Sequence, residues 1–287
     1  MLNYFFDIPE QFSRIENSEY VLISVPFDLT STWQKGADKA PMAILEASKQ
    51  IEIYDIENNY EAYKSGIHTH NVPLDISCSE KMIDSVEKCV LSYLNRKIFP
   101  VVIGGEHSVA IGSVRAVNSF YNDITVLQLD AHADLRDEYK TSKYNHACTM
   151  TRINEITSIV QVGIRSMDIS EKKNIKTNNI FYANDIYNSY DWIKNVLSVL
   201  TKNVYITFDL DVFDPSIMPS TGTPEPGGLD WYLVLKLLKE VCLNKNLVGF
   251  DVCELCPGIN KSPDLLTAKL IYKIIGYHSY YRNIKSN

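Results

Sequence analysis

Three short polar segments contain the residue types in this sequence that can carry out chemistry. The segments are GGEHS at 104–108, DAHAD at 130–134 and DLD at 209–211. Alternate residues of an extended segment face the same side, so the acidic and histidine side chains within the second and third segments share one face. Like charges held this close repel and raise one another's pKa unless a cation neutralises them. The spacing therefore predicts a site for two divalent metal ions.

All six candidate ligands offer a carboxylate oxygen or an imidazole nitrogen. They are His107, Asp130, His132, Asp134, Asp209 and Asp211. Such a set suits Mn²⁺ and other fairly hard ions better than it suits zinc ions of the kind that thiolates bind. Two divalent ions balance four carboxylates, and they lower the pKa of a bridging water so that hydroxide is available at neutral pH. The alternative is a set of solvated acidic turns, which the added GGEHS segment disfavours. Its Gly-Gly pair permits a sharp backbone turn before the histidine.

The composition excludes several classes of partner. Of the 287 residues 45% are hydrophobic and 22% are charged, with a net charge of −7. The acidic balance and the lack of a Lys/Arg cluster argue against a nucleic-acid partner. No apolar run approaches the roughly 20 residues of a membrane span, and the N-terminal MLNYFFDIPEQ lacks the features of a secretory signal. A single domain over 1–287 is expected, because no linker composition interrupts the chain. A cytoplasmic location is expected because the sequence shows neither a membrane span nor the features of a secretory signal.

The remaining histidines and the cysteines are predicted to be structural. His68, His70 and His278 lack acidic neighbours at ligand spacing and are expected to be surface or packed residues. Six cysteines are spread over the chain without dense spacing, which is typical of reduced thiols. Cys253 and Cys256 form a lone C-x-x-C, and a zinc site would need a second such pair, so metal or redox use is disfavoured.

Strand-like and helix-like patterns alternate along the sequence. Strands are predicted at 20–26, 99–103, 124–130, 158–164, 203–210 and 246–252. Helices are predicted at 40–50, 79–96, 108–119, 189–201, 230–243 and 262–276. Continuous apolar strands separated by helices indicate a parallel sheet covered on both faces. The Tyr- and Asn-rich stretch 52–76 is predicted to be an irregular surface excursion.

Each polar segment follows one of the predicted strands. GGEHS follows 99–103, DAHAD completes 124–130 and DLD completes 203–210, while a fourth polar stretch, ELCPG at 254–258, follows 246–252. In open α/β sheets ligands bind at the carboxyl ends of the strands. The four stretches are therefore expected to meet in one site.

The motifs resemble those of the ureohydrolases, the family of arginase and agmatinase. The resemblance extends over about 20–275 and rests on GGEHS, DAHADLRD, SKYNHA at 142–147, QVGIRS at 161–166, TFDLDVFDPSIMPSTGTPEPGG at 207–228 and DVCELCP at 251–257. It implies a three-layer α/β/α fold around an eight-stranded, mostly parallel sheet. It also implies two Mn²⁺ per subunit, a small cationic guanidino substrate, and a homo-trimer or homo-hexamer.

The resemblance also implies a role for each candidate residue. Asp130 and Asp209 would bridge the two ions, His107 and Asp134 would complete one shell, and His132 and Asp211 the other. Glu254 would bind the guanidinium group through charge-assisted hydrogen bonds. Asp134 would take a proton from the nucleophile, and His146 would pass one to the leaving amine. Asp214 would support the ligands without binding metal.

Loop residues favour the agmatinase branch of the resemblance. Leu135–Tyr139 lacks the N-T-P segment typical of arginases, and TGTPEPGG with Glu225 resembles agmatinases, so Glu225 is a candidate for the substrate pocket or a structural turn residue. Arg136 and Arg165 are expected to be structural, with subunit contacts as one option. The expected reaction converts agmatine and water to putrescine and urea. Alternatives are a guanidino-acid hydrolase for guanidinobutyrate or guanidinopropionate, a formiminoglutamase, and a metal-binding paralogue without catalysis.

Overall fold

One parallel sheet organises the computed structural model, which describes residues 4–70 and 72–286. Its order is β2-β1-β3-β8-β7-β4-β5-β6, and every pairing between these strands is parallel. The strands are β1 (Tyr20–Val25), β2 (Ile67–His70), β3 (Phe99–Gly104), β4 (Ile124–Leu129), β5 (Ser158–Ile164), β6 (Ile180–Tyr182), β7 (Asn203–Asp209) and β8 (Asn246–Cys253). The predicted eight-stranded α/β fold is confirmed, and the sheet is parallel throughout rather than mostly parallel.

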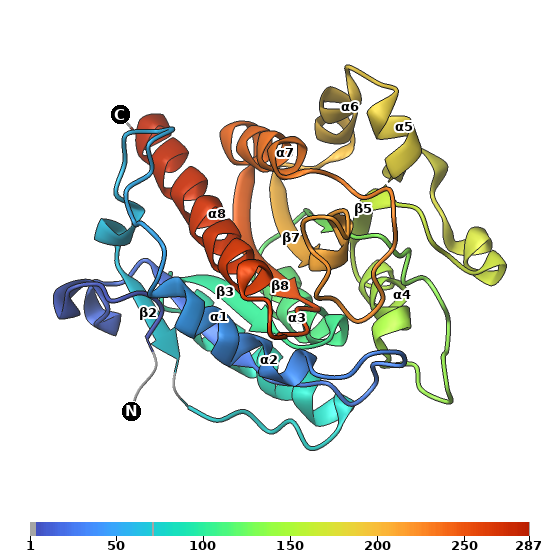
Figure 1. The fold of residues 1–287 in the computed structure, drawn as a ribbon, viewed down its shortest axis with the longest axis horizontal. Helices are drawn as coiled ribbons and strands as arrows, with labels where there is room; N and C mark the ends of the chain where they lie inside the picture. The colour runs from blue at the N-terminus through green and yellow to red at the C-terminus, as the bar shows by residue number, and fades with distance from the viewer. Residues whose placement is uncertain (1–3, 71, 287) are drawn as a thin grey trace.

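Helices cover both faces of the sheet (Figure 1). They are α1 (Ala40–Ser48), α2 (Ser79–Leu94), α3 (Ala110–Phe120), α4 (Thr149–Asn154), α5 (Ala183–Tyr187), α6 (Trp192–Val199), α7 (Trp231–Asn244) and α8 (Ser262–Ser286). On one face α8 packs against α1 and α7, and on the other α3 packs against α2 and α4. Successive residues of β1 enter opposite cores, Leu22 with the first group and Ile23 with the second, as the two-residue period of a strand requires.

The predicted strands and helices are present, and short elements were missed. Strand β2 lies inside 52–76, so the prediction of an irregular excursion is wrong for Ile67–His70. Its alternating burial marks a half-covered edge strand, which carries a weak apolar signal. Strand β6 and helices α4 and α5 are too short to show a period. Positions 1–3, 71 and 287, included in the predictions for the N-terminus, for 52–76 and for the single domain, lie outside the described residues.

The glycine pair at the end of β3 serves close packing of two chain segments. A Cβ on Gly105 would lie 2.1 Å from the carbonyl oxygen of Phe27. The Gly105 and Glu106 amides instead donate to the carbonyls of Val25 and Phe27, at 2.9 and 2.8 Å. Gly105 is therefore needed for backbone approach rather than for a turn, and it lets the segment after β1 pack against GGEHS. None of the helices in the described part of the chain combines the length and apolarity needed to cross a membrane.

Candidate metal centre and active site

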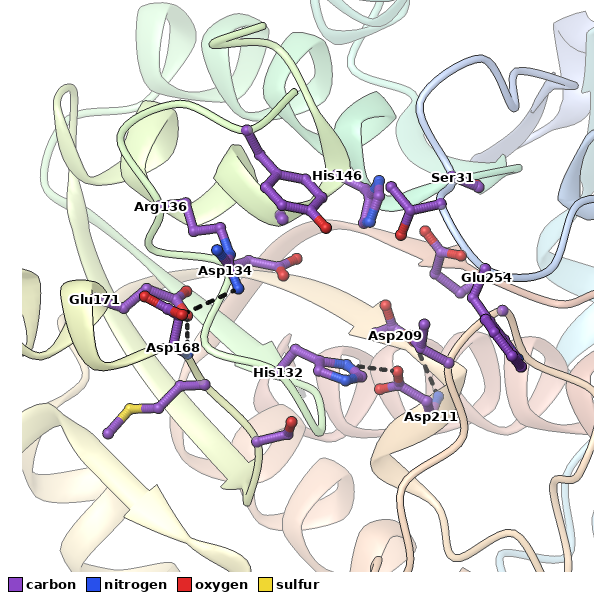
Figure 2. A pocket seen from close by; sticks show the side chains of 18 of the residues that line it. Ser31, His132, Asp134, Arg136, His146, Asp168, Glu171, Asp209, Asp211 and Glu254 are labelled. Carbon is purple, nitrogen blue, oxygen red and sulfur yellow. Dashed lines mark hydrogen bonds and ion pairs between the residues drawn. The ribbon is translucent and has the colours of Figure 1, made fainter. Parts of the chain in front are cut away.

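The four polar stretches follow four neighbouring strands. GGEHS follows β3, Glu254 follows β8, DLD ends β7 and DAHAD follows β4, and the sheet places these strands side by side as β3-β8-β7-β4. Because all four are parallel, their carboxyl ends lie at one edge. Figure 2 shows the resulting pocket, with Asp134, His132, Asp209, Asp211 and Glu254 around a common space.

Two groups of three side chains in this pocket could each hold a metal ion. One is His107, Asp130 and Asp134, and the other is Asp130, His132 and Asp211. In each group the candidate ligand atoms lie within 4.8 Å of one another. Asp130 belongs to both, so its carboxylate can bridge two ions. Asp209 is in neither group, but its Oδ2 lies 3.5 Å from His107 Nδ1.

His107 is oriented by a buried chain of hydrogen bonds. Its Nε2 lies 2.8 Å from Thr207 Oγ1, and the Thr207 hydroxyl donates to Asp251 Oδ1 at 2.8 Å. Since the single hydroxyl proton points to Asp251, Nε2 carries a proton and donates it to Thr207. All three side chains are buried. A partner on the far ring nitrogen fixes the tautomer of metal-binding histidines in this way.

The other nitrogen of His107 faces only acceptors. Nδ1 lies 3.1 Å from both Asp130 Oδ2 and Asp134 Oδ2. With Nε2 protonated, a neutral ring presents a lone pair to these carboxylates, so either a second proton or a metal cation must lie between them. Burial opposes a charged ring, but the two carboxylates outweigh it and raise the pKa of His107 well above its ordinary value. The donor set therefore fits a divalent ion.

The second group shows the same crowding of charge. His132 Nδ1 lies 2.9 Å from Asp211 Oδ2; burial opposes the charged ring, yet Asp211 raises the pKa of His132 to about 10. Burial, followed by the charges of Asp211 and Asp134, raises the pKa of Asp130 to about 7. Bound cations would reverse these pKa shifts, because they stabilise the carboxylates in their ionised form.

Buried amides hold DAHAD in place. Gln128 Nε2 donates to Asp130 Oδ2 at 2.7 Å, and Gln161 Nε2 donates to Gln128 Oε1 at 2.6 Å and to the Ala133 carbonyl at 2.8 Å. The Ala131 amide donates to Asp211 Oδ1 at 3.0 Å, which ties DAHAD to DLD. The candidate ligands are thus fixed by hydrogen bonds from two adjacent strands.

Two site residues adopt left-handed backbone conformations that only glycine adopts easily. Asp134 has φ 53° and Glu254 has φ 72°. Glu254 Oε1 accepts the His107 amide at 2.6 Å, and its Oε2 lies near Gly222 at the cavity wall. Burial and the nearby Glu106 raise the pKa of Glu254 well above its ordinary value. A cationic ligand would therefore strongly stabilise the ionised form of Glu254.

His146 lies at the wall of the same pocket, beside Ser31 (Figure 2). Its Nδ1 lies 3.2 Å from Thr30 Oγ1, and burial lowers its pKa. The half-buried ring is therefore neutral near pH 7. Asn145 caps the short turn that carries it by accepting the Ala147 amide at 3.1 Å.

The cavity has a volume of about 290 Å³, at the small end for ligand pockets. Its acidic lining consists of Asp134, Asp168, Glu171, Asp209, Asp211 and Glu254, against the single guanidinium of Arg136. Arg136 lies 3.7 Å from Asp168 and stacks on Tyr139, so it is partly neutralised. Its place in the lining differs from the purely structural role predicted for it. The cavity as a whole favours a cation.

Three other predicted residues have structural surroundings. The Arg165 guanidinium donates to several backbone carbonyls, among them Asp211 at 2.6 Å and Glu225 at 2.8 Å, so it joins the DLD turn to the later loop. Asp214 accepts the Ser216, Gly227 and Gly228 amides, which lowers its pKa to about 2, and so supports this loop rather than a ligand side chain. The Glu225 side chain lies outside the cavity lining, 3.9 Å from His132 Nε2.

The cysteines and remaining histidines agree with structural roles. All six cysteines, each at a described position, are free. Burial raises the pKa of Cys256 to about 12, so it remains a thiol, and Cys253 donates to Asp251 Oδ1 at 3.4 Å. His278 is buried beside Tyr20, and half-buried His70 lies beside Tyr93; in each pair Nδ1 is 2.8 Å from the phenol oxygen.

The sequence analysis assigned no role to several residues that orient the site. They are Thr30, Glu106, Gln128, Gln161, Glu171, Thr207 and Asp251. The available signal was polar residues within apolar strands, as at Gln128 and Thr207, which buried strands seldom contain without a partner. Their partners lie on other strands and could be identified only in the folded chain.

Comparison with known proteins agrees with this geometry. The model of the arginase family matches residues 18–276. The chain belongs to the arginase family. It is 35% identical to an N(1)-aminopropylagmatine ureohydrolase of Synechocystis, over 96% of each chain. It is 32% identical to an agmatinase of Pyrococcus horikoshii, over 94% of this chain and 96% of that one.

A solved arginase-family structure shows the same fold. The agmatine ureohydrolase of Thermoplasma volcanium superposes with a TM-score of 0.88 at 29% identity, covering 99% of this chain and 97% of that chain. The predicted family and its agmatinase-like branch are confirmed. Membership makes the protein a hydrolase of C–N bonds in amidino groups, and the His/Asp groups give it a centre that could bind metal.

Proposed function

We propose that the chain is a binuclear manganese amidinohydrolase for a guanidino compound that carries an amine and no carboxylate. The observation that carries the proposal is the meeting of two His/Asp groups, joined by Asp130, with the carboxylate of Glu254 in one acid-lined cavity. Agmatine is the first candidate, with putrescine and urea as products. N(1)-aminopropylagmatine is the second, because the similar proteins of Synechocystis and Thermus thermophilus are named for acting on it and because the cavity wall also carries Asp168 and Glu171.

The ligand groups divide the work of holding two ions. His107, Asp130 and Asp134 would hold one, and Asp130, His132 and Asp211 the other, with Asp209 close enough to His107 to bridge. When bound, the ions lower the pKa of water in the site and so provide a nucleophile at neutral pH. Oxygen and imidazole donors without thiolate favour Mn²⁺ among the candidates.

The other residues bind the substrate and move protons. Glu254 would accept hydrogen bonds from the guanidinium group, whose charge keeps this buried carboxylate ionised. Asp134, at the cavity wall, would accept the proton released as the nucleophile attacks the guanidinium carbon. His146, neutral before the reaction, would take up this proton and pass it to the leaving amine, so that the C–N bond breaks to give a neutral amine and urea. The carbon is a poor electrophile, and holding both reactants together removes much of the entropic cost.

The cavity disfavours the guanidino acids as substrates. A substrate carboxylate would need a free positive contact, whereas the guanidinium of Arg136 lies 3.7 Å from Asp168 in a cavity that other acidic side chains also line. Glu225, which faces His132 Nε2, is proposed to orient that ring rather than to contact the substrate. A single domain, a homo-trimer or homo-hexamer, and a cytoplasmic location complete the proposal; the six free thiols support the last.

Urea release in the presence of Mn²⁺ tests the proposal. The substrates to compare are agmatine, N(1)-aminopropylagmatine, arginine, guanidinobutyrate and guanidinopropionate. We expect the highest kcat/KM for one of the first two. Absence of urea from all five would refute the amidinohydrolase function, and preference for a carboxylate-bearing substrate would refute the proposed substrate class. Light scattering after gel filtration tests the oligomeric state.

A further inference from the structure

The segment after β1 is fixed to GGEHS by one buried carboxylate. Glu106 is fully buried, and its Oε2 accepts the backbone amides of Thr30 at 2.5 Å and Ser31 at 3.1 Å. Its Oε1 accepts the hydroxyls of Thr30 at 2.5 Å and Ser108 at 2.6 Å. Burial raises the pKa of Glu106, and the four donors on its two oxygens act against this by stabilising the ionised carboxylate.

The Thr30 hydroxyl connects this carboxylate to His146. Thr30 Oγ1 accepts the His146 backbone amide at 3.0 Å and lies 3.2 Å from His146 Nδ1. A threonine hydroxyl has one proton, and here that proton points to Glu106. The contact with Nδ1 is therefore a hydrogen bond only if Nδ1 carries the proton and donates it to Thr30.

We propose that Thr30 and Glu106 are positioning residues that hold neutral His146 in the Nδ1-protonated tautomer and leave Nε2 bare for proton exchange in the cavity. This inference rests on the proposed function, in which His146 passes a proton to the leaving amine. A bare Nε2 can take up a proton in the cavity and then pass it to the leaving amine, whereas a neutral ring of the opposite tautomer could take one up only at Nδ1, and the Thr30 contact would be lost. The nitrogen that faces Thr30 is Nδ1, which leaves Nε2 as the free ring nitrogen, and His146 lines the cavity with Asp134 and Glu254 (Figure 2).

Glu106 and Thr30 also fix the cavity wall itself. The two backbone amides bound by Glu106 belong to Thr30 and Ser31, where the segment Ser31–Gln34 begins, and the four residues of this segment line the cavity. The same carboxylate therefore sets the position of this wall and the protonated nitrogen of His146. The arrangement parallels Asp251–Thr207–His107, in which a buried carboxylate likewise directs a threonine hydroxyl that accepts from a histidine.

The tautomer can be measured without turnover. Protein labelled with ¹⁵N-histidine and loaded with a diamagnetic divalent ion in place of Mn²⁺ is examined by long-range ¹H–¹⁵N correlation, above the pKa of His146. A His146→Asn variant assigns the signals. We expect the Nδ1–H tautomer in the wild type. A wild-type ring protonated on Nε2 would overturn the proposal, whatever the enzyme hydrolyses.

Three variants separate positioning from general stability. Thr30→Val removes the hydroxyl at nearly constant volume and should abolish the tautomer preference, while Thr30→Ser should restore it. Glu106→Gln should reverse the tautomer, because its amide would keep its oxygen toward the two backbone donors and turn its NH₂ toward Thr30, whose hydroxyl would then donate to His146. Retention of the Nδ1–H tautomer in folded Thr30→Val and Glu106→Gln would overturn the proposal.

Kinetics add a second readout and a matched control. Because a positioned acid–base group contributes about 10²–10⁴-fold, Thr30→Val should lower kcat on the order of 10²-fold with little change in KM. Thr149→Val is the control, because the Thr149 hydroxyl donates to the His146 carbonyl at 2.8 Å and not to its ring. Its tautomer and kcat should stay near wild type. An equal loss of kcat in both variants would refute positioning. A wild type without urea release but with the expected tautomer would refute only the proposed function.

Discussion

Removing the Thr207 hydroxyl should weaken metal binding without touching a metal ligand. Thr207→Val breaks two buried hydrogen bonds of 2.8 Å, one from His107 Nε2 and one to Asp251 Oδ1. The ring is then free to move its proton to Nδ1, the nitrogen that faces Asp130 and Asp134. Loss of such an orienting partner typically costs about 10–100-fold in metal affinity, or roughly 1.4–2.7 kcal/mol.

The metal-free protein should also lose stability. The substitution removes the shorter of the two hydrogen bonds that Asp251 Oδ1 accepts and leaves it the Cys253 thiol at 3.4 Å. Leaving buried polar groups unsatisfied costs about 1–3 kcal/mol. Chemical denaturation of metal-free protein measures this part, and competition with a fluorescent chelator measures Mn²⁺ affinity.

Two controls isolate the effect on the metal. Thr207→Ser keeps the hydroxyl and should keep the affinity. Thr125→Val is the same substitution near the amino end of β4, away from the site, where the buried Thr125 hydroxyl contacts Thr201 at 2.9 Å. It should lower stability without changing the affinity for Mn²⁺. A folded Thr207→Val protein with wild-type Mn²⁺ affinity would refute the role assigned to this chain of hydrogen bonds.

Three further outcomes are expected. Asp130→Ala removes the residue shared by both ligand groups, so metal analysis should find neither ion retained; two ions per subunit would contradict the shared role. Glu254→Gln should keep the metal but lower kcat/KM for the guanidino substrate about 10²–10³-fold, because a buried charge partner is worth about 2–5 kcal/mol; unchanged turnover would exclude its substrate contact. Burial raises the pKa of Glu57, but the hydrogen bonds from Lys239 and Lys273 outweigh burial and lower this pKa from 4.5 to about 2. The stability that ionised Glu57 gives to the folded protein is therefore complete above pH 4.5 and is lost as the pH falls toward 2. Thermal unfolding against pH should show a smaller acid loss in Glu57→Gln than in the wild type.

Long regular elements and the ligand types could be predicted from the sequence, because each has a local signature. Apolar runs such as 124–130 and 203–210 carry enough β-branched and aromatic residues to identify β4 and β7, and alternating Asp and His identify a metal site. Strand β2 was missed because only alternate residues of its IHTH sequence are buried, which leaves too few apolar residues to mark a strand. Arg136 was assigned a structural role because its local sequence carries no sign that it reaches the cavity.

The sequence by itself determined which atoms are available: carboxylate and imidazole ligands at strand ends, and the family to which they belong. Only the tertiary structure decided how they combine. The strand order β3-β8-β7-β4 brings together segments separated by up to about 150 positions, and Asp130 is shared because two groups converge on it. Proton positions on His107 and His146 depend on Thr207 and Thr30, whose partners Asp251 and Glu106 lie far from these threonines in sequence. A local pattern specifies what a side chain can donate or accept, whereas its orientation and protonation follow from neighbours that meet only on folding.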